Sequence, residues 1–240
     1  MIDTIAFDAD DTLWHNESLF TLSQERFAEM LAPYHDRVWV EQKLFETEVR
    51  NLSHYGYGVK GFTLAMIETA IELTEGRIDG ASIGLMLDLA KGMLAAPVEL
   101  LPHVTATVAA LADQGFRLMV VTKGDLFDQE SKVARSGLAE RFHHVEVVSE
   151  KNPETYARLC RRQDIDPARL LMVGNSLKSD VLPVLAIGGY AAHVPYHTTW
   201  AHEQVSGDLP TGDRFAQLDQ LDQLLGRLDG WQQAERVTPV

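Results

Sequence analysis

The sequence predicts an α/β fold, a Rossmann-like parallel sheet with helices on both faces and an all-helical segment inserted after the first strand. In the second half of the chain, short apolar runs of strand length alternate with helical patterns. Such alternation is typical of parallel sheets with right-handed crossovers. Between residues 17 and 94, in contrast, apolar residues recur only at helical spacing.

The first elements follow directly from this pattern. The apolar run 2–7 is too short for a helix and predicts a strand, which ends at the acidic cluster Asp8-Ala-Asp-Asp11. Breaker residues then divide the helical segment, and they are Pro33, the stretch 54–58, and Gly76 with Gly80. Four helices are therefore expected, at about 17–32, 38–52, 60–74 and 80–94. An insert of this size predicts a separate lobe.

The alternating pattern resumes after a helix that ends near Gly115. The expected strands are 116–122, 144–148, 170–173, 190–194 and a short one at 214–216. The expected helices are 126–136, 153–163, 177–187 and a final one near 217–228. The last ten or so residues are expected to fray. In open sheets of this kind the ligand binds beyond the carboxyl ends of the strands, so the residues that end strands are the candidates for chemistry.

Composition and charge exclude several classes of function. The formal net charge of -14 opposes binding to nucleic acids and to anionic membrane surfaces, and no run of Lys or Arg offsets it. No apolar run approaches transmembrane length, and the first residues lack the basic region of a secretory signal. Cys160 is the only cysteine, which fits a reducing compartment. We therefore expect a cytoplasmic protein that binds a small molecule, and its oligomeric state is left open.

Polar side chains follow four of the predicted strands. Asp8 and Asp10 end the first strand, and the alternation of side chains along an extended backbone directs both to the same side. The other strand ends carry a hydroxyl, an amide or a charged group, and these are Thr122 with Lys123, Lys151, and Asn175 with Asp180. Carboxylates, a hydroxyl and lysines are the groups that phosphoryl transfer requires.

The order of these groups resembles the four motifs of the haloacid dehalogenase superfamily. The first motif is matched by Asp8-x-Asp10-x-Thr12, and the fourth by Gly174-Asn-Ser-x-x-x-Asp180. Between them, Thr122 matches the second motif and Lys151 the third, so the resemblance covers nearly the whole chain. The helical segment resembles the C1-type cap of that superfamily. The resemblance implies a core domain over residues 1–15 and 96–240 and a helical cap domain over residues 16–95.

The resemblance also implies a phosphatase that cleaves a small phosphorylated metabolite through an aspartyl-phosphate intermediate. Asp8 would be the nucleophile, and Asp10 would protonate the leaving alkoxide and then deprotonate the attacking water. Thr122 and Lys151 would hold the phosphoryl oxygens, and Lys123, which follows Thr122 directly, is a further candidate for phosphate binding. None of the nine histidines is expected to be catalytic.

The implied cofactor is Mg²⁺, which would offset the repulsion between the nucleophile and the phosphate. Its ligands would be Asp8, the backbone carbonyl of Asp10, and the fourth motif. That motif usually has Asp after its glycine, whereas this chain has Asn175, a neutral ligand that attracts the cation less. Asp180 would partly restore the attraction, and the sequence does not decide which of Asn175 and Asp180 is the main ligand.

Several other functions fit the same core. A phosphomutase would differ only in how the cap excludes water, and it is the main alternative. A 2-haloacid dehalogenase needs no second aspartate, so Asp10 argues against it. A phosphonate hydrolase would need a cap lysine, for which Lys43, Lys60 and Lys91 are available. A non-catalytic sensor of a phosphorylated metabolite is disfavoured by the intact pair of aspartates, and the physiological substrate is not determined by the sequence.

Overall fold

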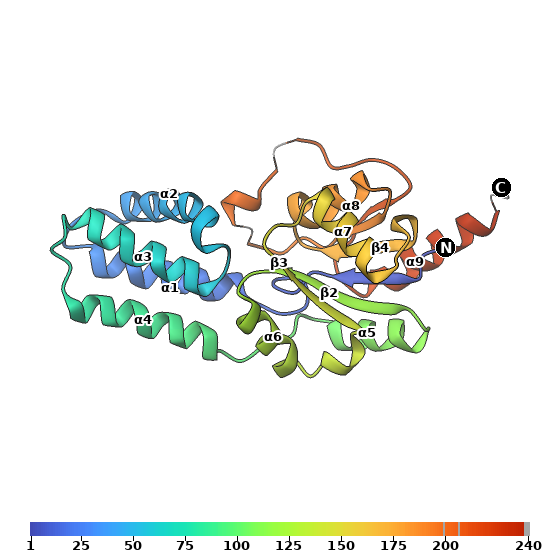
Figure 1. Ribbon diagram of the computed structural model, residues 1–240, viewed down its shortest axis with the longest axis horizontal. Helices are drawn as coiled ribbons and strands as arrows, with labels where there is room; N and C mark the ends of the chain where they lie inside the picture. Colours follow the sequence, from blue (N-terminus) through green and yellow to red (C-terminus); the bar gives the residue numbers. More distant parts are fainter. Residues whose placement is uncertain (199, 206, 238–240) are drawn as a thin grey trace. The chain divides into compact units, whose positions relative to one another are not determined.

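The computed structural model describes residues 1–198, 200–205 and 207–237. The chain forms two compact units, which are coloured along the sequence in Figure 1. The core unit comprises Met1–His15, Val98–Thr122 and Glu130–Val240, and the helical unit comprises Asn16–Pro97 with Lys123–Gln129. The helical unit therefore contains the insert together with a short segment that begins at the last residue of the second strand.

The core unit is built on a six-stranded sheet with the strand order β3-β2-β1-β4-β5-β6. Its strands are β1 Thr4–Phe7, β2 Arg117–Lys123, β3 His144–Val148, β4 Leu170–Gly174, β5 Tyr190–His193 and β6 Phe215–Gln217. β1 pairs in parallel with both β2 and β4. The order of the strands reverses between β1 and β4, and ligands bind at such a switch point in open α/β sheets.

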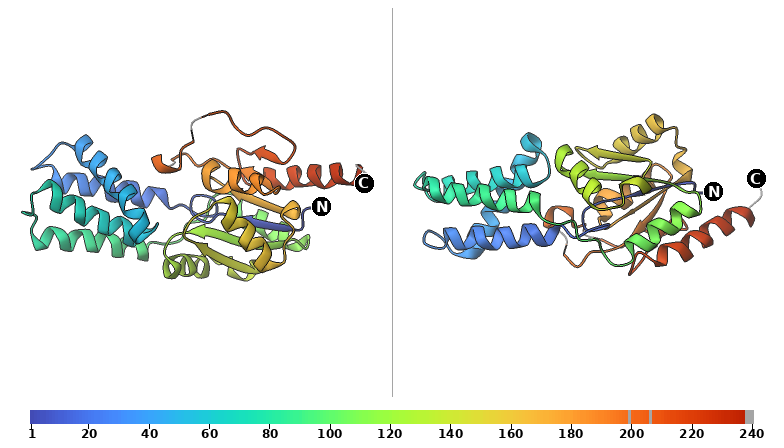
Figure 2. Two further views of the ribbon diagram at one scale, coloured as in Figure 1. Left: turned by 45° about the horizontal axis from the view of Figure 1, so that its top comes forward. Right: turned by 90° about the horizontal axis from the view of Figure 1, so that it is seen from below.

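Helices cover both faces of this sheet, as the two views of Figure 2 show. They are α5 Val104–Asp113, α6 Leu126–Arg135, α7 Pro153–Gln163, α8 Leu182–Ala186 and α9 Gln223–Val237. Alternate residues of β1 enter different cores, because Ile5 and Phe7 pack in a cluster with residues of α5 and α9. Ala6 packs in a second cluster, with residues of α7 and α8. The predicted Rossmann-like α/β fold is confirmed.

The helical unit contains α1 Glu17–Leu31, α2 Arg37–Tyr55, α3 Val59–Leu73 and α4 Gly80–Ala95. These bounds lie close to those predicted from helical spacing. Two of the helices begin at aspartate caps, since Asp36 accepts a hydrogen bond from the Trp39 amide and Asp79 accepts one from the Ser82 amide. In the part of the chain that the structure describes, no helix has the length and apolar character needed to cross a membrane.

Two expectations about the C-terminal region are wrong. The helix predicted near 217–228 begins only at Gln223, because β6 extends to Gln217 and the chain after it turns to bury Leu218 and Leu221 in the sheet core. The segment expected to fray instead continues α9 to Val237. Trp231 anchors it, since its ring packs against Tyr190 and its indole N–H donates to the Asp213 carbonyl at 2.5 Å. The final residues 238–240 lie outside the described part.

Candidate active site

The first motif forms a tight loop immediately after β1. The Asp8 amide donates to the Val173 carbonyl of β4 at 2.9 Å, so the parallel register continues one step beyond the strand. Asp11 then adopts a left-handed conformation with φ of 60°, which aspartate tolerates better than most residues. Its amide donates to the Trp14 carbonyl at 2.7 Å. This turn holds Asp8 and Asp10 at the edge of the sheet where β1 and β4 end.

Asp8 belongs to a buried group of charges. The Lys151 ammonium donates to Asp8 Oδ1 and also to Asp180 Oδ1, the latter at 2.7 Å. Asp8 is 7% exposed, Lys151 4% and Asp180 1%. Burial raises the pKa of Asp8 to about 7, against the opposite effect of the Lys151 charge. Burial alone would lower the pKa of Lys151, but the charges of Asp180 and Asp8 outweigh it and raise that pKa, so the lysine is a cation at neutral pH.

The backbone of the fourth motif holds Asp180 in place. Asp180 Oδ2 accepts a hydrogen bond from the Ser176 amide at 3.0 Å. At Gly174 an added Cβ would lie 2.2 Å from the same oxygen, so only glycine leaves room for this carboxylate. The residues Leu177–Val181 form a single π-helical turn, η3, in place of the regular helix start that the sequence predicted. Both oxygens of Asp180 are therefore engaged, one by Lys151 and one by the loop backbone.

The side chain of Asn175 lies close to Asp8. The Thr12 hydroxyl is 3.2 Å from Asp8 Oδ2 and 3.3 Å from Asn175 Oδ1, so these two oxygens converge on one hydroxyl. The backbone of Asn175 is anchored by His193 on β5, whose Nε2 donates to the Asn175 carbonyl at 3.0 Å. His193 was not singled out from the sequence, because nothing in its local pattern shows that it reaches the fourth motif.

The side-chain oxygens of Asp8 and Asn175 are of the type that binds Mg²⁺. Carboxylate and amide oxygens are hard ligands of the kind that Mg²⁺ accepts, and Asp8 with Asn175 supplies one formal negative charge. Within residues 1–198, 200–205 and 207–237, no group of three or more His, Cys, Asp or Glu side chains is arranged to hold a metal. A cation here would therefore depend on Asp8, the Asn175 amide oxygen and backbone carbonyl oxygens.

Asp10 has different partners from Asp8. Its Oδ1 accepts a hydrogen bond from the Trp14 indole N–H at 2.7 Å and one from the Lys132 ammonium at 2.9 Å. The same ammonium lies 3.1 Å from Asp10 Oδ2. Lys132 was missed by the sequence analysis, although its position carries a signal. It lies on the buried stripe of α6 with Gln129 and Val133, where a charged residue requires a partner.

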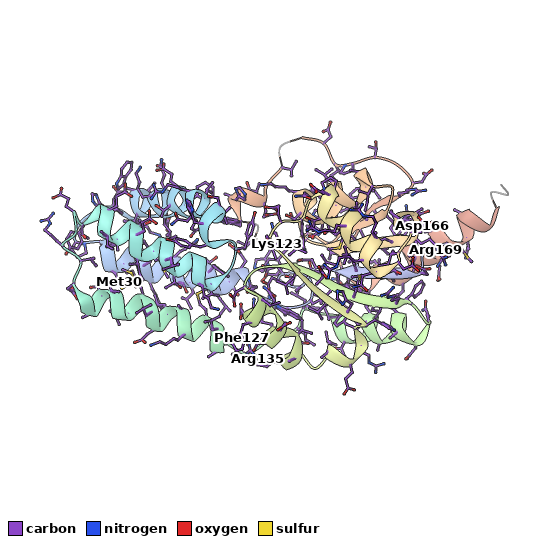
Figure 3. All side chains as sticks on the ribbon, viewed as in Figure 1. Met30, Lys123, Phe127, Arg135, Asp166 and Arg169 are labelled. Carbon is purple, nitrogen blue, oxygen red and sulfur yellow. The ribbon has the colours of Figure 1, made fainter. Side chains whose placement is uncertain are left out.

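Thr122 and Lys123, the predicted phosphate-binding pair, belong to different units. Thr122 is buried at the end of β2, two residues beyond Val120, which pairs with Phe7 of β1. Lys123, labelled in Figure 3, belongs to the helical unit, where its ammonium lies 4.0 Å from the centroid of the Tyr57 ring. The role of both residues in phosphate binding stays a prediction.

The sequence analysis also missed a short 3₁₀ helix, η4, Ala201–Glu203, in the loop after β5. Glu203 Oε2 accepts hydrogen bonds from the hydroxyls of Ser176, at 2.6 Å, and Ser179. Lys178 donates to the His202 carbonyl at 2.7 Å. This loop therefore holds the fourth motif in place through hydrogen bonds with the side chains of Ser176, Lys178 and Ser179. The local sequence does not indicate these contacts, because they join residues that are far apart in the chain and meet only in the folded protein.

The chain is similar to known proteins in both sequence and fold. The sequence profile of the haloacid dehalogenase-like hydrolases matches residues 2–188. The chain belongs to this family. A haloacid dehalogenase-like family hydrolase from Xanthomonas campestris is 40% identical, with a TM-score of 0.87 over 99% of this chain and 95% of the other. The predicted membership of the superfamily is confirmed, and with it the assignment of the chain as a hydrolase.

Other members of the family differ in the reaction for which they are named. The glyceraldehyde 3-phosphate phosphatase of Methanopyrus kandleri is 26% identical over 189 residues, which cover 75% of this chain and 78% of that protein. The 2-haloacid dehalogenase of Pseudomonas syringae is 22% identical, with a TM-score of 0.63 over 96% of this chain and 100% of the other. The latter similarity is one of fold alone.

Proposed function

We propose that this haloacid dehalogenase-like hydrolase cleaves a small phosphomonoester through an aspartyl-phosphate formed on Asp8. The observation that carries the proposal is the buried ion pair between Lys151 and Asp8, with Asp180 as a second partner of the lysine. A carboxylate nucleophile and a phosphate repel each other, and a cation fixed beside the nucleophile reduces that repulsion. The name of the Methanopyrus relative supports a small phosphorylated metabolite as substrate.

The reaction proceeds in two steps. In the first, an Asp8 carboxylate oxygen bonds to phosphorus while the bond from phosphorus to the leaving-group oxygen breaks, and Asp10 gives its proton to that oxygen. In the second, Asp10 removes a proton from water, whose oxygen bonds to phosphorus as the bond between phosphorus and Asp8 breaks. Free phosphate leaves and the Asp8 carboxylate is restored. The Thr122 hydroxyl and the Lys151 ammonium hold the phosphoryl oxygens.

The proposed metal site uses Asp8, the Asn175 side-chain oxygen and the Asp10 backbone carbonyl. When bound, Mg²⁺ would neutralise charge on the phosphoryl group and favour the ionised form of Asp8. We assign Asp180 to holding Lys151 in place, because its two oxygens already accept hydrogen bonds from Lys151 and the Ser176 amide. Of the two fourth-motif residues, Asn175 is therefore the proposed ligand.

We propose that the leaving group is an alkoxide, which must be protonated as it departs. Asp10, held by Trp14 and Lys132, favours phosphoryl transfer over carbon–halogen cleavage, because a departing halide needs no proton whereas an alkoxide does. We further propose that the helical unit is the cap that selects the leaving group. A cytoplasmic location stays a prediction.

The proposed function is tested by hydrolysis of p-nitrophenyl phosphate with and without Mg²⁺. Turnover is expected with Mg²⁺ and is expected to disappear with excess EDTA. Asp8→Asn should abolish turnover, and its circular dichroism and melting temperature should show a folded protein. The loss of turnover in this variant would also exclude a contaminating phosphatase as the source of the activity. Full activity in metal-free enzyme would contradict the metal requirement, and substantial turnover by Asp8→Asn would remove Asp8 as nucleophile.

A further inference from the structure

We infer that Lys132 is a positioning residue for Asp10, whose carboxyl group it holds in one fixed orientation. The inference rests on the proposed function and extends it to a residue outside the four motifs. Lys132 lies in the second half of α6, Leu126–Arg135, and belongs with Asp10 to the core unit.

The distances distinguish the two oxygens of Asp10. Oδ1 accepts hydrogen bonds at 2.7 Å from Trp14 and at 2.9 Å from Lys132, which occupy both of its lone pairs. The contact of Lys132 with Oδ2 is longer, at 3.1 Å. Trp14 and Lys132 together therefore fix Oδ1, and the second contact of Lys132 limits rotation of the Asp10 carboxyl group.

Both donors are fixed by their own packing. Trp14 is 1% exposed and lies in the same core cluster as Val133, the residue that follows Lys132 on α6. The Lys132 side chain is 10% exposed, compared with 21% for Asp10. A buried ammonium of this kind is retained only with a partner. The carboxyl group of Asp10 is consequently held in one orientation from two directions.

The contacts of Lys132 separate its role from that of Lys151. Lys151 binds Asp8 and Asp180, whereas the ammonium of Lys132 is in contact with both oxygens of Asp10. Lys132 therefore acts on the reaction through Asp10 and affects the step in which the leaving group is protonated. A residue that only stabilised the fold would affect all substrates alike.

The test compares two aryl phosphates that differ in leaving group. Phenyl phosphate releases a more basic oxygen than p-nitrophenyl phosphate and so depends more strongly on the general acid, whose contribution is typically about 10²–10⁴-fold. In Lys132→Met, kcat/KM for phenyl phosphate is expected to fall by roughly 10²-fold, and that for p-nitrophenyl phosphate by less than about tenfold. Lys132→Arg, which keeps the charge, should recover part of the loss.

Two further variants show whether Lys132 acts through Asp10. In an Asp10→Asn background, adding Lys132→Met should leave the ratio of kcat/KM for the two aryl phosphates unchanged. The general acid that Lys132 positions is already absent from this background. This double variant also removes both charges of the pair, so it offers a folded comparison if Lys132→Met alone is unstable. Arg135→Met is the matched control, since Arg135 is exposed at the end of the same helix (Figure 3) and should leave both rates unchanged.

The outcomes separate this inference from the function on which it rests. Equal losses for the two substrates in Lys132→Met, or an additional change of their ratio in the Asp10→Asn background, would overturn the role of Lys132. Wild-type turnover would still support the phosphatase assignment in that case. Failure of the wild-type enzyme to hydrolyse either aryl phosphate would instead contradict the proposed function.

Discussion

Asp8 and Asp10 lie in the same loop but have different surroundings. Asp8 meets a buried lysine that it shares with Asp180, and burial raises its pKa to about 7. Asp10 is more exposed and is held by an indole N–H and a second lysine. A nucleophile needs charge compensation beside the phosphate, whereas an acid–base group needs a fixed direction for its proton. Under the proposed function, this loop prepares two carboxylates for two tasks, and each carboxylate is held by its own lysine.

The largest expected effect comes from removing the lysine on the Asp8 side. Lys151→Met leaves Asp8 and Asp180 buried without their cation, and breaking a buried ion pair costs about 3–5 kcal/mol. We expect the free energy of unfolding to fall by about that amount and kcat/KM to fall by roughly 10³-fold, as loss of a charge-stabilising group does in other active sites. Denaturant unfolding and steady-state kinetics measure the two effects.

Lys178→Met is the control for this variant, because Lys178 lies in η3 with Asp180 but is exposed and donates to the His202 carbonyl. Its effect on unfolding should stay within about 0.5 kcal/mol. A loss of activity in Lys151→Met no greater than that of the control would show that the ion pair with Asp8 is not needed.

The next effect concerns the metal on the Asp8 side. Asn175→Asp adds a second negative charge next to Asp8 Oδ2, and a unit charge at about 4 Å contributes roughly 1–4 kcal/mol at effective dielectric constants between 80 and 20. The half-saturating concentration of Mg²⁺ should therefore fall by about tenfold. Isothermal titration measures binding independently of turnover. Equal or weaker binding would move the ligand role from Asn175 to Asp180, and Asn175→Ala should weaken binding if the assignment is right.

The smallest effect is expected on the Asp10 side. Trp14→Phe keeps an aromatic ring in the core and removes one hydrogen bond to Asp10 Oδ1, whose typical net contribution is about 1 kcal/mol. We expect a loss of about that size in the free energy of unfolding and about a fivefold loss in kcat/KM. Trp39→Phe, at a half-exposed position of α2, should change neither. Unchanged kinetics in Trp14→Phe would show that the indole hydrogen bond does not contribute to the role of Asp10.

Much of the fold could be predicted because the sequence pattern and the structure depend on the same periodicities. Strand ends in a parallel sheet meet at one edge, so Asp8 and Asn175 could be expected to lie together from their positions after two buried strands. The end of the chain was harder, because the packing of Trp231 against Tyr190 joins segments that no local pattern connects.

The missed site residues could not be predicted for the same reason, since their contacts join distant segments of the chain. Lys132 lies in the middle of a helix and Glu203 in an irregular loop, and neither position is next to a strand end. Their contacts depend on how α6 and the loop after β5 return to the sheet. A charged residue on the buried stripe of α6 was the one local sign that could have indicated Lys132.

The central claim is that phosphate is transferred to Asp8, and trapping the intermediate tests it most directly. Wild-type enzyme turning over a phosphomonoester with Mg²⁺ is quenched in acid and treated with borohydride, which reduces an acyl phosphate to an alcohol and so converts aspartate to homoserine. Mass spectrometry of the peptide that contains residues 1–26 should show homoserine at position 8 only when substrate was present. Active enzyme with no modification, or with the modification at another carboxylate, would contradict the account.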